Sequence, residues 1–207
     1  MKKIFSEFIL GDMCACYVQD EETGSVELVL LPADMAYEVA YREKPYPDSL
    51  VQVKLSGDTY AGGRTMRQSA SVLSLRLEGQ ETQDEGSRTA VCTALADGRG
   101  HRYRHYLVWK QGKKSLLSYT EFENVSEEAA ELEMLSSFSL SGISPFMGAD
   151  ESGLLKLHRI RSVWSMEGRT ESQLLEDLQL EPSWGDPSHE IFVGFWKSSG
   201  IKAFPIL

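Results

Sequence analysis

The cysteine and histidine residues are the first in this chain that could do chemistry. Cys14 and Cys16 are two residues apart, which puts both thiols on the same side of a β-strand, and the even spacing of His101 and His105 does the same for two imidazoles. A structural zinc site normally needs a second ligand pair beside the first. We therefore expect no metal, with the cysteines packing as small buried hydrophobes and the histidines lying at the surface.

Other catalytic motifs are absent from the sequence. There is no phosphate loop, no Gly-x-Gly-x-x-Gly and no Gly-x-Ser-x-Gly elbow. The segment from Gly57 to Arg64 is glycine-rich, but it lacks the Lys-Ser/Thr pair that would hold phosphate and Mg²⁺, so a polar turn is expected. A glycosidase needs two facing carboxyls, and with 31 acidic residues many pairs arise by chance. The residues alone show no catalytic constellation.

Composition and charge exclude several classes of protein. The chain has 207 residues, 42% of them hydrophobic, and a formal net charge of −10. Enough apolar surface is present to fold, which excludes a disordered chain, and the acidic balance argues against nucleic-acid and membrane partners. No run approaches the roughly 18 apolar residues of a membrane-spanning helix. Glu7 interrupts the apolar start, so no signal peptide is expected, and three cysteines suit a reducing cytoplasm.

Apolar residues mostly recur at a spacing of two, which is typical of strands with one buried face. Turn residues separate the runs, so the pattern favours a β-sandwich or barrel over alternating strands and helices. The clearest runs are 26–30, 51–55, 72–77 and 106–109.

Three segments are harder to assign. The polar stretch from Glu78 to Arg88 is interpreted as a solvated loop or wide hairpin, and Ser126–Ala130 as a hairpin tip rather than part of a helix. Residues 170–178 fit a capped helix and a strand about equally well.

A set of motifs along the chain is more distinctive than its composition. The most specific stretch runs from Leu157 to Arg169 and is followed by Leu180-Glu181-Pro182-Ser183-Trp184. Further motifs are the segment 50–58 with its Gly-Asp turn, Arg-Thr-Met-Arg-Gln-Ser at 64–69, Phe-Glu-Asn at 122–124 and Leu-Ser-Ser-Phe at 135–138. Together they resemble the N-terminal domain of bacterial α-galactosidases of glycoside hydrolase family 36. The ending resembles the strand pair before that family's catalytic barrel, with Trp196 and Lys197 as departures.

This resemblance implies an all-β fold: a large antiparallel β-sandwich, the supersandwich of galactose-mutarotase-like type, forming one domain over residues 1–207. It also favours a strand over a helix at 170–180. The family's catalytic aspartates, a nucleophile and an acid/base, lie on a later (β/α)₈ barrel, expected beyond Leu207. The resemblance thus implies no catalytic residue in this chain and no cofactor. The parent enzyme would cleave terminal α-galactosides of the melibiose and raffinose type with retention.

The resemblance also implies partners and a site. The partners are the chain's own catalytic barrel, further copies in a homo-oligomer, and α-galactoside sugars through the parent enzyme, in the cytoplasm. The turn from Asp58 to Arg67 would border the sugar pocket of a neighbouring subunit, with Asp58, Arg64 and Arg67 as substrate-rim residues, because the arginine fork can donate paired hydrogen bonds. A solvated loop with paired arginines is the alternative for this turn.

A second class of function stays open from the residues alone. The chain could be a free-standing carbohydrate-binding β-sandwich, since tyrosine and tryptophan faces suit the C–H edges of sugars. Core packing explains most aromatic residues equally well, and we expect Trp164 and Trp184 to be packing anchors. The length of the reading frame would discriminate the two classes.

Overall fold

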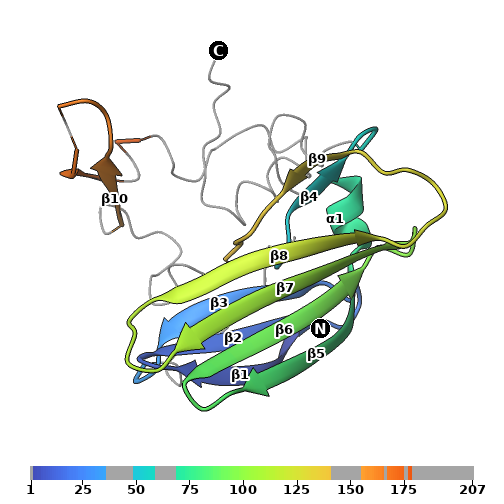
Figure 1. The fold of residues 1–207 in the computed structure, drawn as a ribbon, viewed down its shortest axis with the longest axis horizontal. Helices are drawn as coiled ribbons and strands as arrows, with labels where there is room; N and C mark the ends of the chain where they lie inside the picture. Colours follow the sequence, from blue (N-terminus) through green and yellow to red (C-terminus); the bar gives the residue numbers. More distant parts are fainter. Residues whose placement is uncertain are drawn as a thin grey trace. The chain divides into compact units, whose positions relative to one another are not determined.

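The computed structural model describes residues 2–35, 49–58, 69–140, 155–165, 167–174 and 177–178. The chain divides into two compact units, a larger one of Met1–Glu43 with Pro47–Ile143 and a smaller one of Lys44–Tyr46 with Ser144–Leu207. The described residues are predominantly β-strand with one short helix, and every strand pair is antiparallel (Figure 1). The predicted all-β class is confirmed at this level.

The first sheet of the larger unit has three strands in chain order. They are β1 (Lys2–Leu10), β2 (Met13–Asp20) and β3 (Val26–Pro32). Gly11 and Asp12 form the turn between β1 and β2, and Gly11 has a φ of 70°, which glycine adopts without strain. This turn sets Leu10 opposite Met13, and the register continues unbroken to Ser6 opposite Tyr17. The strand predicted at 26–30 is confirmed.

The second sheet is a four-stranded meander. Its strands are β5 (Arg76–Asp84), β6 (Arg88–Ala96), β7 (His101–Lys110) and β8 (Leu116–Asn124). The run predicted at 106–109 lies in β7 and is confirmed. The polar stretch from Glu78 to Arg88 is a hairpin rather than a loop, because β5 is an edge strand whose side chains can stay in water.

A small third sheet joins segments distant in sequence. It consists of β4 (Val53–Leu55) and β9 (Leu132–Leu135), so the predicted strand at 51–55 is confirmed over its last three residues. The interpretation of Ser126–Ala130 as a hairpin tip is wrong, because β9 pairs with β4 and not with β8. Alternation shows that a segment is a strand, but it does not show which strand it pairs with.

The strand predicted at 72–77 is wrong in its first half, where the helix α1 (Ala70–Ser74) lies. The Ser69 Oγ caps this helix by accepting a hydrogen bond from the Val72 amide at 3.1 Å. Val72 and Leu75 are both buried while Leu73 is 46% exposed. Buried residues three apart lie on one side of a helical turn but on opposite faces of a strand, so the burial of Val72 and Leu75 fits the helix.

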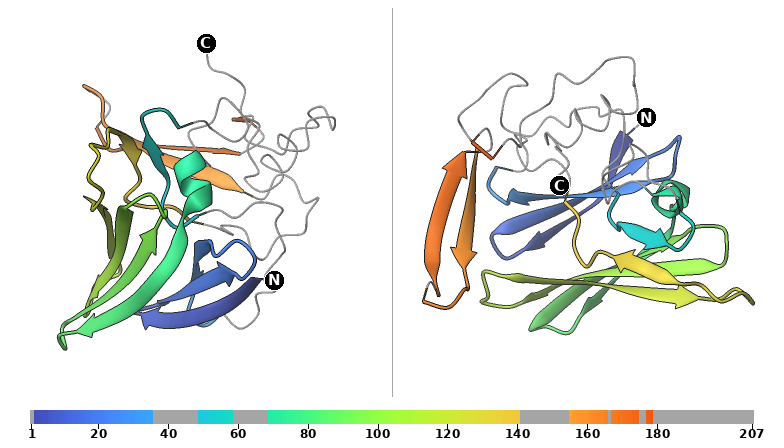
Figure 2. Two further views of the ribbon diagram at one scale, coloured as in Figure 1. Left: turned by 90° about the vertical axis from the view of Figure 1, so that its right-hand side faces the viewer. Right: turned by 90° about the horizontal axis from the view of Figure 1, so that it is seen from above.

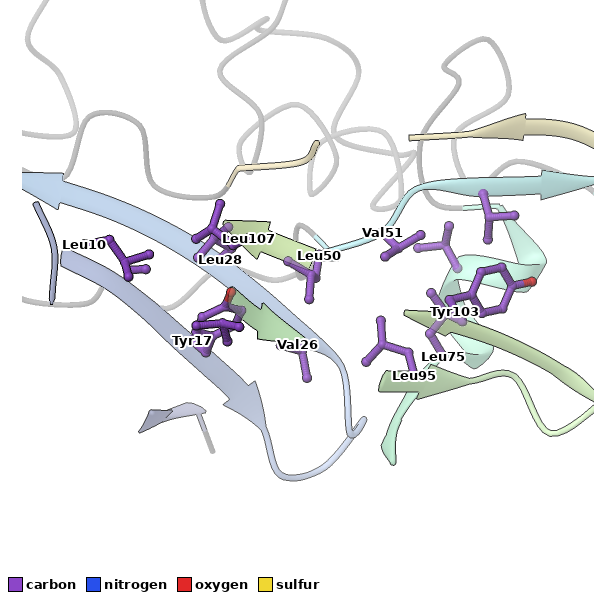
Figure 3. Packing of buried hydrophobic residues seen from close by; sticks show 14 of the residues in the cluster. Leu10, Tyr17, Val26, Leu28, Leu50, Val51, Leu75, Leu95, Tyr103 and Leu107 are labelled. Atoms are coloured by element: carbon purple, nitrogen blue, oxygen red, sulfur yellow. The ribbon is translucent and has the colours of Figure 1, made fainter. Parts of the chain in front are cut away.

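The main core of the larger unit lies between its two larger sheets, which face each other in Figures 1 and 2. Tyr17 and Leu28 reach it from the three-stranded sheet, and Tyr103 and Leu107 from the four-stranded one (Figure 3). The opposite face of β2 and β3 is also buried. Its separate cluster contains Cys14, Cys16, Val18, Val29 and Leu31.

The smaller unit contains one described hairpin, of β10 (Lys156–Arg161) and β11 (Arg169–Leu174). The strand favoured at 170–180 is confirmed for 170–174, whereas residues 177–178 form a turn. Trp164 lies in the β10–β11 turn and is 91% exposed, so its prediction as a packing anchor is wrong. The motif is a two-stranded ribbon in which most side chains are exposed, so the hairpin by itself does not bury Trp164. Trp184 lies outside the described residues.

Candidate functional site

The Gly-Asp turn after β4 holds the one predicted rim residue that the structure describes. Gly57 has a φ of 85°, and the Asp58 Oδ2 accepts hydrogen bonds from the Leu55 amide at 3.0 Å and from the Ser71 Oγ at 2.5 Å. The Arg99 Nη1 lies 3.5 Å from the other carboxylate oxygen, and the Asp58 side chain is only 3% exposed. Arg64 and Arg67 lie outside the described residues, so the substrate-rim assignment of all three stays a prediction.

Burial by itself would raise the pKa of the Asp58 carboxyl. Hydrogen bonds from Ser71 and Leu55 and the charge of Arg99 outweigh it and hold that pKa below its ordinary value. Asp58 is therefore an anion held in place by donors from three parts of the larger unit. This arrangement fixes the point at which the glycine-rich segment leaves β4.

A second buried carboxylate lies at the β6–β7 hairpin. The Asp97 Oδ1 accepts from the Arg99 and His101 amides at 2.8 and 3.2 Å, and its Oδ2 lies 2.7 Å from the His101 Nδ1. The Arg99 Nε is 3.4 Å from the same Oδ2, and the Asp97 side chain is fully buried. Arg99 therefore bridges Asp97 and Asp58 while half of its own side chain stays exposed.

Serine, histidine and aspartate in one network suggest a comparison with hydrolytic triads, in which histidine takes the serine proton. Here the Ser71 Oγ donates to the Asp58 carboxylate and accepts from the Arg99 Nη2. Among the described residues no hydrogen bond joins Ser71 to His101. The network is thus a clamp that ties α1, the turn after β4 and the β6–β7 hairpin together, and it does not generate a nucleophile.

The histidine pair lies on one face of β7 as the spacing predicted, but both residues are buried rather than at the surface. His101 is 8% exposed and packs on Phe122 with ring centroids 5.6 Å apart. His105 is fully buried, and its Nε2 lies 2.9 Å from the Ser118 Oγ. Burial lowers the pKa of His105 to about 4, so its ring is neutral at pH 7. The alternation in the sequence could not reveal that the two histidines are buried, because a histidine fits either face of a strand.

The cysteine pair lies on β2 with both thiols buried, as expected of small hydrophobes. The Cys14 and Cys16 Sγ atoms are 3.5 Å apart, and the Cys16 Sγ is 3.6 Å from the Glu7 Oε1. Glu7 was not among the residues that the sequence singled out. Its signal was the Gly11-Asp12 turn, since a two-residue loop there sets residue 7 opposite residue 16. Burial first, and then Cys14 and Glu7, raise the pKa of the Cys16 thiol to about 12.

One aromatic pair lies away from the main core of the larger unit. Tyr106 and Tyr119 are directly opposite on β7 and β8, and their rings stack with centroids 4.6 Å apart. The Tyr106 hydroxyl donates to the Glu121 carboxylate at 3.1 Å. One face of each ring therefore contacts the other ring, which leaves only the outer face of each ring for any other contact.

None of the described helices is both long and apolar enough to cross a membrane. Comparison with protein-family models, with curated proteins and with solved structures finds no match to this chain.

Proposed function

We propose that this chain is the non-catalytic N-terminal β-sandwich domain of a family 36 α-galactosidase, which packs on the enzyme's own barrel, supports oligomer assembly and borders the sugar pocket. The parent enzyme hydrolyses terminal α-galactosides with retention in the cytoplasm. The motifs that resemble this family are the basis of the proposal. The two facing antiparallel sheets of the larger unit agree with a sandwich.

The observation that carries the proposal is the pairing of two of these motifs. The segment 50–58 and the Leu-Ser-Ser-Phe motif at 135–138 are far apart in sequence, yet Val53 is directly opposite Leu135. Two hydrogen bonds join Gln52 and Ser136. The backbone N–H of Gln52 donates to the Ser136 Oγ, and the backbone N–H of Ser136 donates to the backbone carbonyl of Gln52, each at 2.8 Å. Two segments that carry the resemblance thus form one structural element, which supports treating them as one family signature.

The reading frame provides the first test. The coding sequence after the Leu207 codon is determined, and the chain is produced alone and together with what that frame encodes. We expect a (β/α)₈ barrel to follow, and only the longer protein to hydrolyse a nitrophenyl α-galactoside with retention. A frame that encodes no barrel, or turnover by the 207 residues alone, contradicts the proposal. Binding of galactosides by the chain where no barrel follows supports the carbohydrate-binding alternative.

The rim residues provide the second test, in the longer protein. Replacing Arg67 by alanine should lower kcat/KM about tenfold or more, roughly 1.4 kcal/mol, with little change in Tm. Arg88→Ala is the matched control, because Arg88 lies on β6 and pairs only loosely with Glu85 at 3.6 Å. Equal kinetics of the two variants in a correctly assembled oligomer would leave the turn a purely structural element.

A further inference from the structure

The β1–β2 hairpin brings two thiols and one carboxylate together on the face opposite the main core. One potential ligand atom from each of Glu7, Cys14 and Cys16 lies within 4.8 Å of the other two. Both cysteines are on β2 at positions that share a face, and Glu7 is directly opposite Cys16 on β1. Adjacent hydrogen-bonded strands hold all three side chains, so the backbone fixes the cluster.

We propose that Glu7, Cys14 and Cys16 form a three-ligand site for a Zn(II) ion. Zinc binds thiolate at about 2.3 Å and carboxylate oxygen at about 2.0–2.2 Å in tetrahedral geometry. Those bond lengths require sulfur atoms about 3.8 Å apart and a sulfur–oxygen separation of about 3.6 Å. The structure has 3.5 Å between the sulfurs and 3.6 Å from the Cys16 sulfur to the Glu7 oxygen. These two edges already fit a tetrahedral site to within a few tenths of an ångström. The third edge, from the Cys14 sulfur to the Glu7 oxygen, is within 4.8 Å and has to reach about 3.6 Å when the ion binds, which rotation of the exposed Glu7 side chain can provide.

The surroundings suit a thiolate-binding metal. Cys14 and Cys16 are each 3% exposed and pack with Val18, Val29 and Leu31. Glu7 is exposed, so the ion can enter from the carboxylate side. Thiolate ligands select zinc and copper(I) over magnesium and calcium, which prefer oxygen. A mixed set of two sulfurs and one carboxylate oxygen favours zinc within that group.

The binding step balances as a proton exchange. Each thiol loses its S–H proton to solvent as an S–Zn bond forms, so one Zn(II) ion displaces two protons and no electron moves. The Glu7 carboxylate supplies the third bond, and a water molecule can complete the tetrahedron. The site uses residues outside the Asp58–Arg67 turn, so it goes beyond the proposed function and does not depend on it.

The experiment titrates the purified, reduced and metal-free chain with Cd(II) and Co(II), and then competes these ions with Zn(II). We expect one equivalent to bind with a sulfur-to-metal charge-transfer band that Zn(II) abolishes. Cys14→Ala and Cys16→Ala should each lower the affinity at least tenfold. Cys92→Ala is the matched control, because Cys92 is also a free, buried cysteine but lies on β6, and it should bind like the wild type.

Glu7→Gln tests the third ligand, and since Glu7 is exposed this variant should fold. We expect a weaker site, by about tenfold, with the charge-transfer band retained at saturation. Circular dichroism checks the fold of each variant, and Zn(II) should raise the Tm of the wild type and of Cys92→Ala but not of Cys16→Ala. The proposal is overturned if the wild type shows no band, if Cys92→Ala loses it, or if Glu7→Gln binds as tightly as the wild type.

Discussion

His105 should make the stability of this protein fall as the solution becomes mildly acidic. Its imidazole is fully buried on β7 between Thr93 of β6 and Thr120 of β8, and the Ser118 hydroxyl bonds to its Nε2. Burial lowers its pKa in the folded state from 6.5 to about 4. Replacing His105 by glutamine removes this titration and keeps a polar group that can bond to Ser118.

The sign and size of this pH effect on the free energy of unfolding follow from the pKa values of His105 in the unfolded and folded states. Above pH 6.5 the ring is neutral in both states and contributes no pH dependence. Between pH 6.5 and 4 the unfolded chain binds a proton that the folded protein does not, so the free energy of unfolding decreases as the pH falls. The full effect is about 3 kcal/mol, at roughly 1.4 kcal/mol per pKa unit, and about 2 kcal/mol of it should be lost between pH 7 and pH 5.

Urea unfolding at pH 7 and at pH 5 measures this loss for the wild type and for His105→Gln. Other titrating groups contribute alike to both proteins, so we compare the pH-dependent losses and not the absolute stabilities. The variant should lose about 2 kcal/mol less than the wild type. Ser118→Ala is the control, because it removes the hydrogen-bond partner of His105 but keeps the imidazole, and it should lose stability as the wild type does. Equal losses in the wild type and His105→Gln would refute the assignment of a buried neutral His105.

Three further substitutions test other parts of the larger unit by thermal or urea unfolding. Tyr103→Phe should raise stability by about 1 kcal/mol, because the buried hydroxyl has no hydrogen-bond partner among the described residues; a loss of stability would reveal a partner. Gly100→Ala should lower the free energy of unfolding by at least about 1 kcal/mol more than Gly98→Ala does. Both glycines have positive φ, but only at position 100 would the new Cβ meet the Ser126 Cβ, at 2.8 Å. Equal losses in the two variants would contradict this steric reason. Asp97→Ala should lower the free energy of unfolding by about 3 kcal/mol and Arg99→Ala by about 1 kcal/mol, because the Asp97 side chain is buried and that of Arg99 is half exposed. A larger loss for Arg99→Ala would contradict the role of Asp97 as the main acceptor of the clamp.

The sequence by itself determined the local features of this protein. Alternation predicted β3, part of β4 and β7, because side chains on a strand alternate between two faces whatever the strand pairs with. The same local rule placed the Cys14 and Cys16 thiols together and the His101 and His105 rings together.

Only the tertiary structure decided which segments meet and which faces are buried. In the run 72–77, Leu73 and Leu75 are two apart, as in a strand, whereas Val72 and Leu75 are three apart, as in a helical turn. The cap from Ser69 together with the packing of α1 selects the helix. The Gly11-Asp12 turn sets Glu7 opposite Cys16 locally, but packing decides that the Cys14 and Cys16 face is buried. Likewise, Asp58 and Asp97 share Arg99 because distant loops pack together. Periodicity is a property of neighbouring residues, whereas pairing and burial depend on residues far away along the chain, and a single sequence does not display those contacts.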